Sequence, residues 1–307
     1  MKVRFGVITD LHAEYIPDSV QRMRSFLDTC LARNVDFCIQ LGDFCPPGEK
    51  NIEHKREILS LLRRFPRPFY HVIGNHDTDE NVKSDVLNFV GGGSPYTSFD
   101  VGGVHFVILD ACYYRDADGC HSYEKGNHKH APDGAIISVI PPAELEWLKR
   151  DLEGTRLPSV IFSHQSLIES RASIENTEEL RAIFREARGG VVLAVCGHEH
   201  VDRLEHRDGT AYYCLNSASY YWAGSKYSHS TYGDEIEGAY PQIRKVFPYR
   251  DPLFAVIDIK DGEISVSGVS SNIVGALPSE VGFHKDGLCD PICASVTDRR
   301  WKIRLLS

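Results

Sequence analysis

Short apolar segments that alternate with helix-like segments limit the possible folds of this chain more than any other feature. Strand-like apolar runs occur at 3–8, 37–39, 69–73, 104–109, 160–162 and 191–196. Between them, apolar residues recur at helical spacing within 20–31, 52–62, 145–152 and 177–188. Strand, helix and strand repeated in this way predict a layered α/β sheet.

The pattern changes to antiparallel β beyond Gly197. Two pairs of strand-like runs flank strong turn signals at Asp208-Gly209 and Asp261-Gly262, which predicts two hairpins. The segments 111–140 and 217–252 have no clear period and are too long for plain connections. We therefore predict one domain over 1–270 with irregular insertions at 111–140 and 217–252, and a C-terminal extension, 271–307, that packs on the same domain.

The composition restricts the class of partner. The formal net charge is -9, whereas a protein that clamps long nucleic acid needs a basic stripe. No apolar run approaches the ~20 residues of a membrane span, and residues 1–5 enter a strand without a signal-peptide pattern. The nine cysteines are scattered, as is typical of a reduced protein. We expect a cytoplasmic protein that binds neither membranes nor long nucleic acid, of undetermined oligomeric state.

Polar residues that can bind metals follow five of the predicted strands. Because open α/β sheets bind ligands beyond the carboxyl ends of their strands, these residues mark a candidate site. In chain order the motifs are Asp10-x-His12, Gly42-Asp43, Gly74-Asn75-His76-Asp77, Ser163-His164 and Gly197-His198-Glu199-His200.

The residue types in these motifs favour a pair of divalent cations. Asp, Asn and His are ligands for metals of intermediate hardness. Seven such residues in five clusters exceed the needs of one ion, and a carboxylate can bridge two ions ~3.5–4 Å apart. The glycines that precede Asp43, Asn75 and His198 allow tight turns and close backbone approach.

In this order the motifs resemble those of the calcineurin-like metallophosphoesterase superfamily over residues 10–200. The resemblance implies a four-layer αββα sandwich of two mixed β-sheets flanked by helices. It implies two divalent ions, whose identity stays open among manganese, iron, zinc and cobalt. One ion would bind Asp10, His12 and His200, and the other would bind Asn75, His164 and His198. Asp43 would bridge them, His76 would be catalytic, and Asp77 would orient His76.

One motif departs from the pattern of many relatives. They have glycine before the fourth-motif histidine and proline two residues after it, whereas this chain has Ser163-His164-Gln165-Ser166. His164 remains a predicted ligand because a strand precedes it, but the shape of the adjoining loop does not follow from the resemblance.

The resemblance implies hydrolysis of a phosphate ester by a water held between the two metals, with His76 protonating the leaving oxygen. Segments 107–111 and 145–148 resemble the manganese-dependent ADP-ribose/CDP-alcohol diphosphatases. We therefore expect a small phosphorylated substrate, either a phosphodiester or a nucleoside-diphosphate derivative. A phosphomonoesterase and a catalytically silent scaffold of the same fold remain alternatives, and the net charge weighs against a nuclease.

Four residues are candidate substrate contacts: Asn75, His76, Tyr113 and His128. Two of them, Tyr113 and His128, lie in the aperiodic 111–140 segment, where a solvated loop is the simpler interpretation of His128. The tyrosines of the 217–252 segment could stack on a base, but packing of a long loop against the body is the simpler interpretation.

Overall fold

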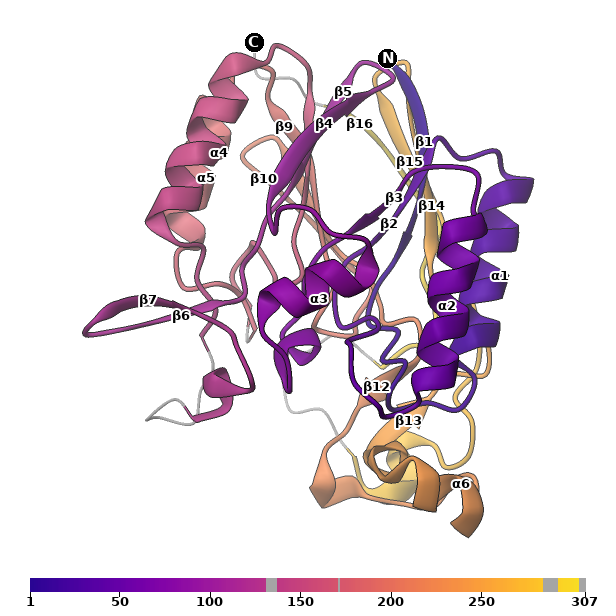
Figure 1. Cartoon of the computed structure of the whole chain (residues 1–307). Helices are drawn as coiled ribbons and strands as arrows, with labels where there is room; N and C mark the ends of the chain where they lie inside the picture. Colours follow the sequence, from indigo (N-terminus) through magenta and orange to yellow (C-terminus); the bar gives the residue numbers. More distant parts are fainter. Residues whose placement is uncertain (131–136, 171, 284–291, 304–307) are drawn as a thin grey trace.

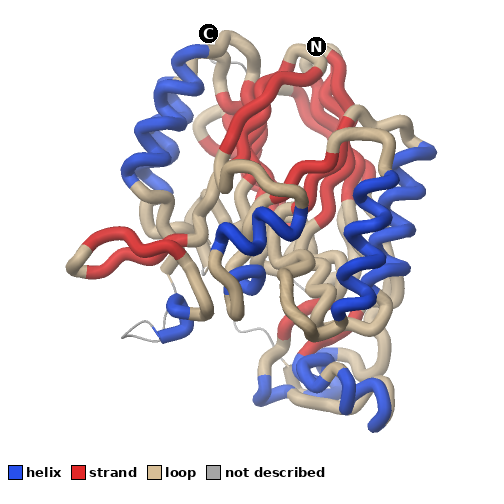
Figure 2. Tube along the Cα trace, in the orientation of Figure 1, coloured by secondary structure: helices blue, strands red, loops and turns tan. Residues whose placement is uncertain are grey.

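The computed structural model describes residues 1–130, 137–170, 172–283 and 292–303, and its ribbon is drawn in Figure 1. Two six-stranded sheets face each other, and helices cover their outer faces (Figures 1 and 2). The four-layer arrangement of two mixed sheets flanked by helices is therefore confirmed. Within the described residues, no helix combines the length and apolar character needed to cross a membrane.

The first sheet is built around parallel strands β1, β2 and β3. Helices connect these strands, as parallel crossovers require. Three antiparallel strands extend the sheet beyond β1, and the turn at Asp261-Gly262 joins two of them as predicted. The strand order is β16 (Arg299–Lys302), β15 (Glu263–Ser267), β14 (Ala255–Lys260), β1 (Lys2–Ile8), β2 (Phe37–Gln40) and β3 (Phe69–His71).

The second sheet has four parallel strands at its centre and an antiparallel strand at each edge. The predicted hairpin at Asp208-Gly209 forms one of these edges. The strand order is β10 (Arg203–Arg207), β11 (Thr210–Cys214), β9 (Val191–Cys196), β8 (Ser159–Phe162), β5 (Val104–Ile108) and β4 (Thr97–Val101).

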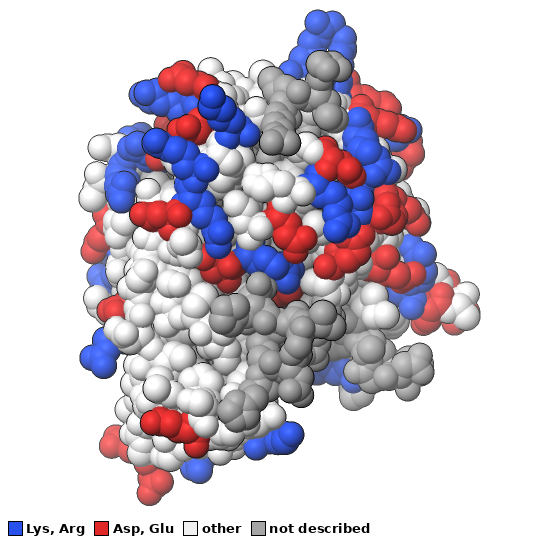
Figure 3. Space-filling view, turned by 180° about the vertical axis from the view of Figure 1, so that it is seen from behind, with Lys and Arg blue, Asp and Glu red and all other residues white. Residues whose placement is uncertain are grey.

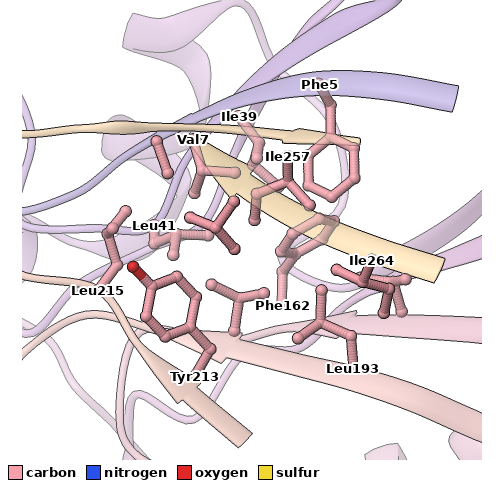
Figure 4. Packing of buried hydrophobic residues seen from close by; sticks show 14 of the residues in the cluster. Phe5, Val7, Ile39, Leu41, Phe162, Leu193, Tyr213, Leu215, Ile257 and Ile264 are labelled. Atoms are coloured by element: carbon pink, nitrogen blue, oxygen red, sulfur yellow. The ribbon is translucent and has the colours of Figure 1, made fainter. Parts of the chain in front are cut away.

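Alternate residues of the strands fill separate cores on the two faces of each sheet. Phe5 and Val7 of β1 pack against Phe162 and Leu193 in the core between the sheets (Figure 4). Ile8 points to the outer face, where α1 (Ser19–Ala32) and α2 (Ile52–Arg64) cover the first sheet. Helices α4 (Pro142–Gly154) and α5 (Thr177–Glu186) cover the second sheet in the same way. This alternation follows from the two-residue period of a strand.

The two segments without a clear period contain short elements of their own. Within 111–140 are a hairpin that projects from the body and a 3-10 turn, and 217–252 forms a small lobe around α6 (Figure 1). The remaining elements are η1 (His76–Thr78), α3 (Lys83–Val90), β6 (Tyr113–Asp116), β7 (Gly119–Ser122), η2 (Asn127–His130), β12 (Tyr220–Trp222), η3 (Ser225–Tyr227), α6 (Asp234–Ala239), η4 (Pro241–Lys245), β13 (Val246–Pro248) and η5 (Pro278–Val281).

The described part of 271–307 contacts the body through backbone pairing and through side chains. Strand β16 pairs with β15 at the edge of the first sheet, and the Asn216 side chain donates a hydrogen bond to the Cys293 carbonyl. The division into a domain over 1–270 and an extension stays a prediction. The eight cysteines within the described residues are free, and Cys289 lies outside them.

Candidate metal centre

Two groups of side chains with metal-binding atoms lie where the carboxyl ends of strands from both sheets meet. Asp10, His12 and His200 form the first group, and Asp43, His164 and His198 form the second. The candidate ligand atoms within each group lie within 4.8 Å of one another. The loops after β1, β2, β8 and β9 supply all six residues, because parallel strands bring their carboxyl ends to the same edge of a sheet.

The backbone at this edge adopts unusual conformations. Five of the seven predicted ligands have positive φ angles: Asp10 (52°), His12 (49°), Asp43 (49°), His198 (67°) and His200 (54°). Left-handed conformations of non-glycine residues cost on the order of 1–3 kcal/mol each and tend to cluster at functional sites. These residues lie in the loops that follow β1, β2 and β9.

A glycine permits a close approach between two of these loops. Gly42 has a φ of +102°, and a Cβ atom at this position would lie 2.5 Å from His164 Nδ1 and 2.7 Å from the Gly74 backbone. Any side chain would therefore separate the loop that carries Asp43 from the loop that carries His164. The glycine that precedes Asp43 has the role predicted for it.

In the first group, neighbouring backbone and side chains direct the ligand atoms toward a shared point. His200 Nδ1 lies 2.8 Å from the Tyr220 carbonyl, which leaves Nε2 facing Asp10 Oδ1 at 3.2 Å. Asp10 Oδ2 accepts hydrogen bonds from Thr9 Oγ1 and the His198 amide. Both ring nitrogens of His12 are buried and lack a hydrogen-bond partner. A buried imidazole without a partner is unfavourable unless it binds something else.

In the second group, His164 occupies the centre. Its Nδ1 lies 2.7 Å from the Leu41 carbonyl, so that Nε2 faces Asn75 Oδ1 at 3.1 Å and Asp43 Oδ2 at 3.3 Å. A hydrogen bond at the second nitrogen is the usual way in which proteins fix the orientation of a metal-binding histidine. The departure from the family motif around His164 therefore does not prevent its side chain from facing Asn75 and Asp43.

Asp43 lies between the two groups. Its Oδ2 atom is 3.9 Å from His12 Nε2 in the first group and 3.3 Å from His164 Nε2 in the second, while its Oδ1 atom accepts the His76 amide at 2.7 Å. Burial alone would raise the pKa of Asp43, but His164, His76 and His12 outweigh burial and hold the pKa well below its usual value. Asp43 is therefore ionised, as a bridging ligand must be.

The donor set fits a pair of divalent cations. Two buried carboxylates, an amide oxygen and four imidazoles are ligands of the kind that manganese, iron, zinc or cobalt accept. Burial lowers the pKa of His198 to about 3, with repulsion from His164 adding to this effect, which keeps the ring in the neutral form that binds metal. The positions of all seven residues agree with their predicted role, which stays a prediction.

His76 lies beside both groups without belonging to either. Its ring centre is 5.4 Å from that of His12, and 37% of its side chain is exposed to the cavity above the site. Its Nδ1 atom lies 2.8 Å from Asp79 Oδ2. Burial opposes the protonated form, but Asp43 and Asp79 raise the pKa of His76 to about 9. The imidazole is thus placed to donate a proton into the cavity.

The predicted role of Asp77 was wrong. Its carboxylate accepts hydrogen bonds from three backbone amides, those of Asp43 at 2.9 Å, Phe44 at 3.0 Å and Gly74 at 2.9 Å. Asp77 therefore connects the backbone of the second motif to that of the third. The partner of His76 is instead Asp79, three residues along, which the sequence analysis missed. No local signal distinguished Asp79 from Asp77, because the direction of each side chain depends on how residues 76–79 turn.

A cavity of about 1080 Å³ opens above the two groups. Its lining includes His12, Asp43, His76, Asp79, Lys129, Glu199, Arg203, Tyr15, Tyr220, Trp222 and Phe283. Of the four predicted substrate contacts, His76 lines the cavity, and Asn75, Tyr113 and His128 do not. Tyr113 instead packs over Lys83, whose Nζ lies 3.6 Å from the ring centre. His128 is 1% exposed and lies behind Asp79, so neither the predicted rim contact nor the solvated loop describes it.

Comparison with known proteins places these residues in a family context. The family described as "Calcineurin-like phosphoesterase" matches residues 3–202. The "Manganese-dependent ADP-ribose/CDP-alcohol diphosphatase" of Oryza sativa subsp. japonica is 26% identical over 253 residues, which are 64% of this chain and 77% of the rice protein.

Solved structures share the fold. A dimetal phosphatase from Danio rerio superposes with a TM-score of 0.60 at 16% identity, covering 89% of this chain and 98% of that one. GAP50 of Plasmodium, described as "the anchor in the inner membrane complex", superposes with a TM-score of 0.50 at 14% identity, covering 89% and 88% of the two chains. At these identities the likeness shows the fold alone.

Substitution of the shared carboxylate tests the metal centre. We expect Asp43→Asn to lower bound manganese from about two ions per chain to one or fewer, because the charge between the two groups is lost. Metal content after dialysis, measured by mass spectrometry, reports the change. The control is Asp116→Asn, which removes an exposed carboxylate from the projecting hairpin. Equal metal content in both variants would contradict the bridging role.

Proposed function

The chain belongs to the calcineurin-like phosphoesterase family and is a metal-dependent phosphoesterase, and from this premise we propose that it uses two divalent cations to hydrolyse a small phosphodiester or nucleoside-diphosphate derivative. The observation that carries the proposal is the position of Asp43, whose carboxylate faces a ligand group on either side. Both groups lie beneath one cavity, so a phosphate in it can reach both.

The residues of the chain have separate tasks in this proposal. Asp10, His12 and His200 would hold one cation, Asn75, His164 and His198 would hold the other, and Asp43 would serve as a ligand to both. When bound, the cations supply Lewis acidity and lower the pKa of water from 15.7 to ~7. We propose manganese as the metal, because the rice relative is described as manganese-dependent.

His76 is the proposed general acid. Asp79 occupies its Nδ1 atom, so Nε2 is the atom available to protonate the leaving oxygen. A pKa of about 9 keeps the imidazole protonated at neutral pH. General acid catalysis of this kind is typically worth ~10²–10⁴-fold in rate.

The walls of the cavity favour a substrate with a planar ring. Aromatic side chains surround one side of it, and Trp222 is 46% exposed there. An exposed indole offers a face on which a nucleobase can stack, an interaction worth ~1–3 kcal/mol. The size of the cavity, about 1080 Å³, is in the range that binds a nucleotide-sized ligand. The rice relative, described as an ADP-ribose/CDP-alcohol diphosphatase, supports the same substrate class.

Three alternatives receive less support. A phosphomonoesterase would use the same metals, but a cavity of this size accepts groups on both sides of the phosphorus. A catalytically silent scaffold would not need a complete set of metal ligands, whereas this chain has all seven predicted ligands. A nuclease needs a basic groove, whereas basic and acidic side chains are intermixed on the face seen in Figure 3.

The location is also part of the proposal. The free thiols of the eight described cysteines are consistent with a reducing compartment, which supports the cytoplasm.

A substrate panel tests the proposed activity. With added manganese we expect cleavage of bis-p-nitrophenyl phosphate and of ADP-ribose or a CDP-alcohol, at rates well above that for p-nitrophenyl phosphate, and complete loss of activity with a chelator. Release of p-nitrophenol and chromatography of the nucleotides measure these rates. A preference for the monoester would favour the phosphomonoesterase. Absence of all activity from manganese-loaded protein would favour the scaffold.

Removal of the proposed general acid separates catalysis from metal binding. We expect His76→Ala to lower kcat by ~10²–10⁴-fold while metal content stays the same, because His76 lies outside both ligand groups. His121→Ala is a matched control, since His121 is also 37% exposed and also pairs with an aspartate, but lies on the projecting hairpin. Unchanged turnover in His76→Ala would remove His76 from the mechanism.

Substitution of Trp222 tests whether this side of the cavity binds the planar ring of a substrate. We expect Trp222→Ala to raise KM for ADP-ribose or a CDP-alcohol by about 5–150-fold, the equivalent of ~1–3 kcal/mol of stacking. Its effect on bis-p-nitrophenyl phosphate should be smaller. Leu277→Ala removes a similarly exposed apolar side chain, 49% against 46%, that does not line the cavity. Equal KM changes for both substrates would contradict a base-stacking role.

A further inference from the structure

Asp79 lines the cavity beside the proposed catalytic histidine and pairs with it. Its Oδ2 atom lies 2.8 Å from His76 Nδ1, and only 11% of its side chain is exposed. Asp77 cannot replace it, because three backbone amides already occupy that carboxylate. The orientation of the His76 ring therefore depends on where Asp79 is held.

The 111–140 segment docks on the loop that carries Asp79. The Gly126 amide donates to the Thr78 carbonyl at 3.1 Å, and the Lys125 amide donates to the Asn81 carbonyl at 2.9 Å. Gly126 has a φ of +70°, and a Cβ atom there would lie 2.9 Å from the Asp79 carbonyl oxygen. The two backbones thus meet at a distance that only glycine allows.

Two side chains of the docked segment reach the Asp79 carboxylate itself. Lys129 Nζ lies 2.7 Å from Oδ2, and His128 Nε2 lies 3.4 Å from Oδ1, which is an electrostatic contact rather than a short hydrogen bond. The His128 ring is buried and stacks on Tyr123, with ring centres 4.4 Å apart and planes at 22°. Lys129 therefore contacts the same oxygen atom as His76, whereas His128 contacts the other oxygen, and together they restrain the carboxylate.

We propose that Asp79 is the positioning residue for His76, and that the 125–129 segment holds Asp79 in place, so that catalysis in this chain depends on the insertion. This inference rests on the proposed function of His76. In this arrangement Asp79 accepts a hydrogen bond from the Nδ1–H group of His76 and directs Nε2 toward the cavity. Carboxylates commonly orient catalytic histidines in this way. Lys129 and His128 limit the movement of the carboxylate.

The charges agree with this geometry. Burial would raise the pKa of Asp79, but His128, His76 and Lys129 outweigh burial and hold that pKa well below its usual value. Asp79 therefore stays ionised, and an ionised acceptor makes a stronger hydrogen bond to an imidazole than a neutral one.

A spectroscopic test addresses the positioning role independently of activity. In proton NMR of the zinc-loaded protein, we expect an exchange-protected Nδ1 proton of His76, assigned by its absence from His76→Ala. It should be lost in Asp79→Asn. Asp151→Asn is the matched control, because Asp151 also lies 2.8 Å from a histidine, His105, but outside the cavity lining. Persistence of the signal in Asp79→Asn would overturn the proposal.

A kinetic test uses two diesters that differ in their need for a general acid. p-Nitrophenolate leaves bis-p-nitrophenyl phosphate unaided, whereas diphenyl phosphate requires protonation of its leaving oxygen. We expect Asp79→Asn to lower kcat about 10²-fold for diphenyl phosphate and less than about 10-fold for bis-p-nitrophenyl phosphate, and we expect the same pattern in His76→Ala. Asp151→Asn should leave the ratio of the two rates unchanged. An equal loss on both diesters in Asp79→Asn would overturn the positioning role.

The contribution of the insertion is tested at its charged contact. We expect Lys129→Gln to shift the ratio of the two rates in the same direction as Asp79→Asn, by about 2–5-fold, as the loss of one partly exposed ion pair implies. Lys149→Gln is the control, since the two lysines have similar exposure, 46% and 44%, and each pairs with a carboxylate. An unchanged ratio in Lys129→Gln would overturn the role of the insertion. A wild-type protein inactive on both diesters would instead refute the proposed function. In that case the NMR experiment alone would decide whether Asp79 positions the His76 ring.

Discussion

The arrangement of the site depends on the contacts of one buried carboxylate, that of Asp43. Its Oδ1 atom accepts the His76 amide, and its Oδ2 atom faces His12 on one side and His164 on the other. Its own amide donates to Asp77. Asp43 thus joins the second and third motifs through its backbone and the two ligand groups through its side chain. A shift of this residue would alter all of these relationships at once.

The rest of the fold holds this carboxylate where water would otherwise solvate it. Parallel strands from both sheets end at the same edge, and apolar cores on either side of each sheet fix the strands. Figure 4 shows the core between the two sheets. Five ligand residues adopt left-handed backbone conformations, which costs on the order of 1–3 kcal/mol each. Burial of the extensive cores stabilises the fold enough to maintain that strain.

The sequence was informative wherever a functional residue stood next to a strand. Asp10, Asp43 and His164 could be identified because each follows an apolar run directly, and the register of a strand determines where its end lies. The pairing of His76 could not be predicted in the same way. Asp77 and Asp79 are both near it in sequence, and only the turn that follows Asn75 decides which carboxylate meets the ring.

Local sequence order by itself determined the layered α/β architecture, the five ligand motifs and the kind of metal chemistry they support. These features depend on periodicity and on residue type, which are properties of short segments. Tertiary structure alone decided that Asp77 binds backbone amides, that His128 is buried behind Asp79, and that the insertion docks beside the loop that carries His76. Some of those contacts join residues far apart in the chain, and others depend on the conformation of a loop. Neither long-range contacts nor loop conformations produce a periodic sequence pattern from which they could be predicted.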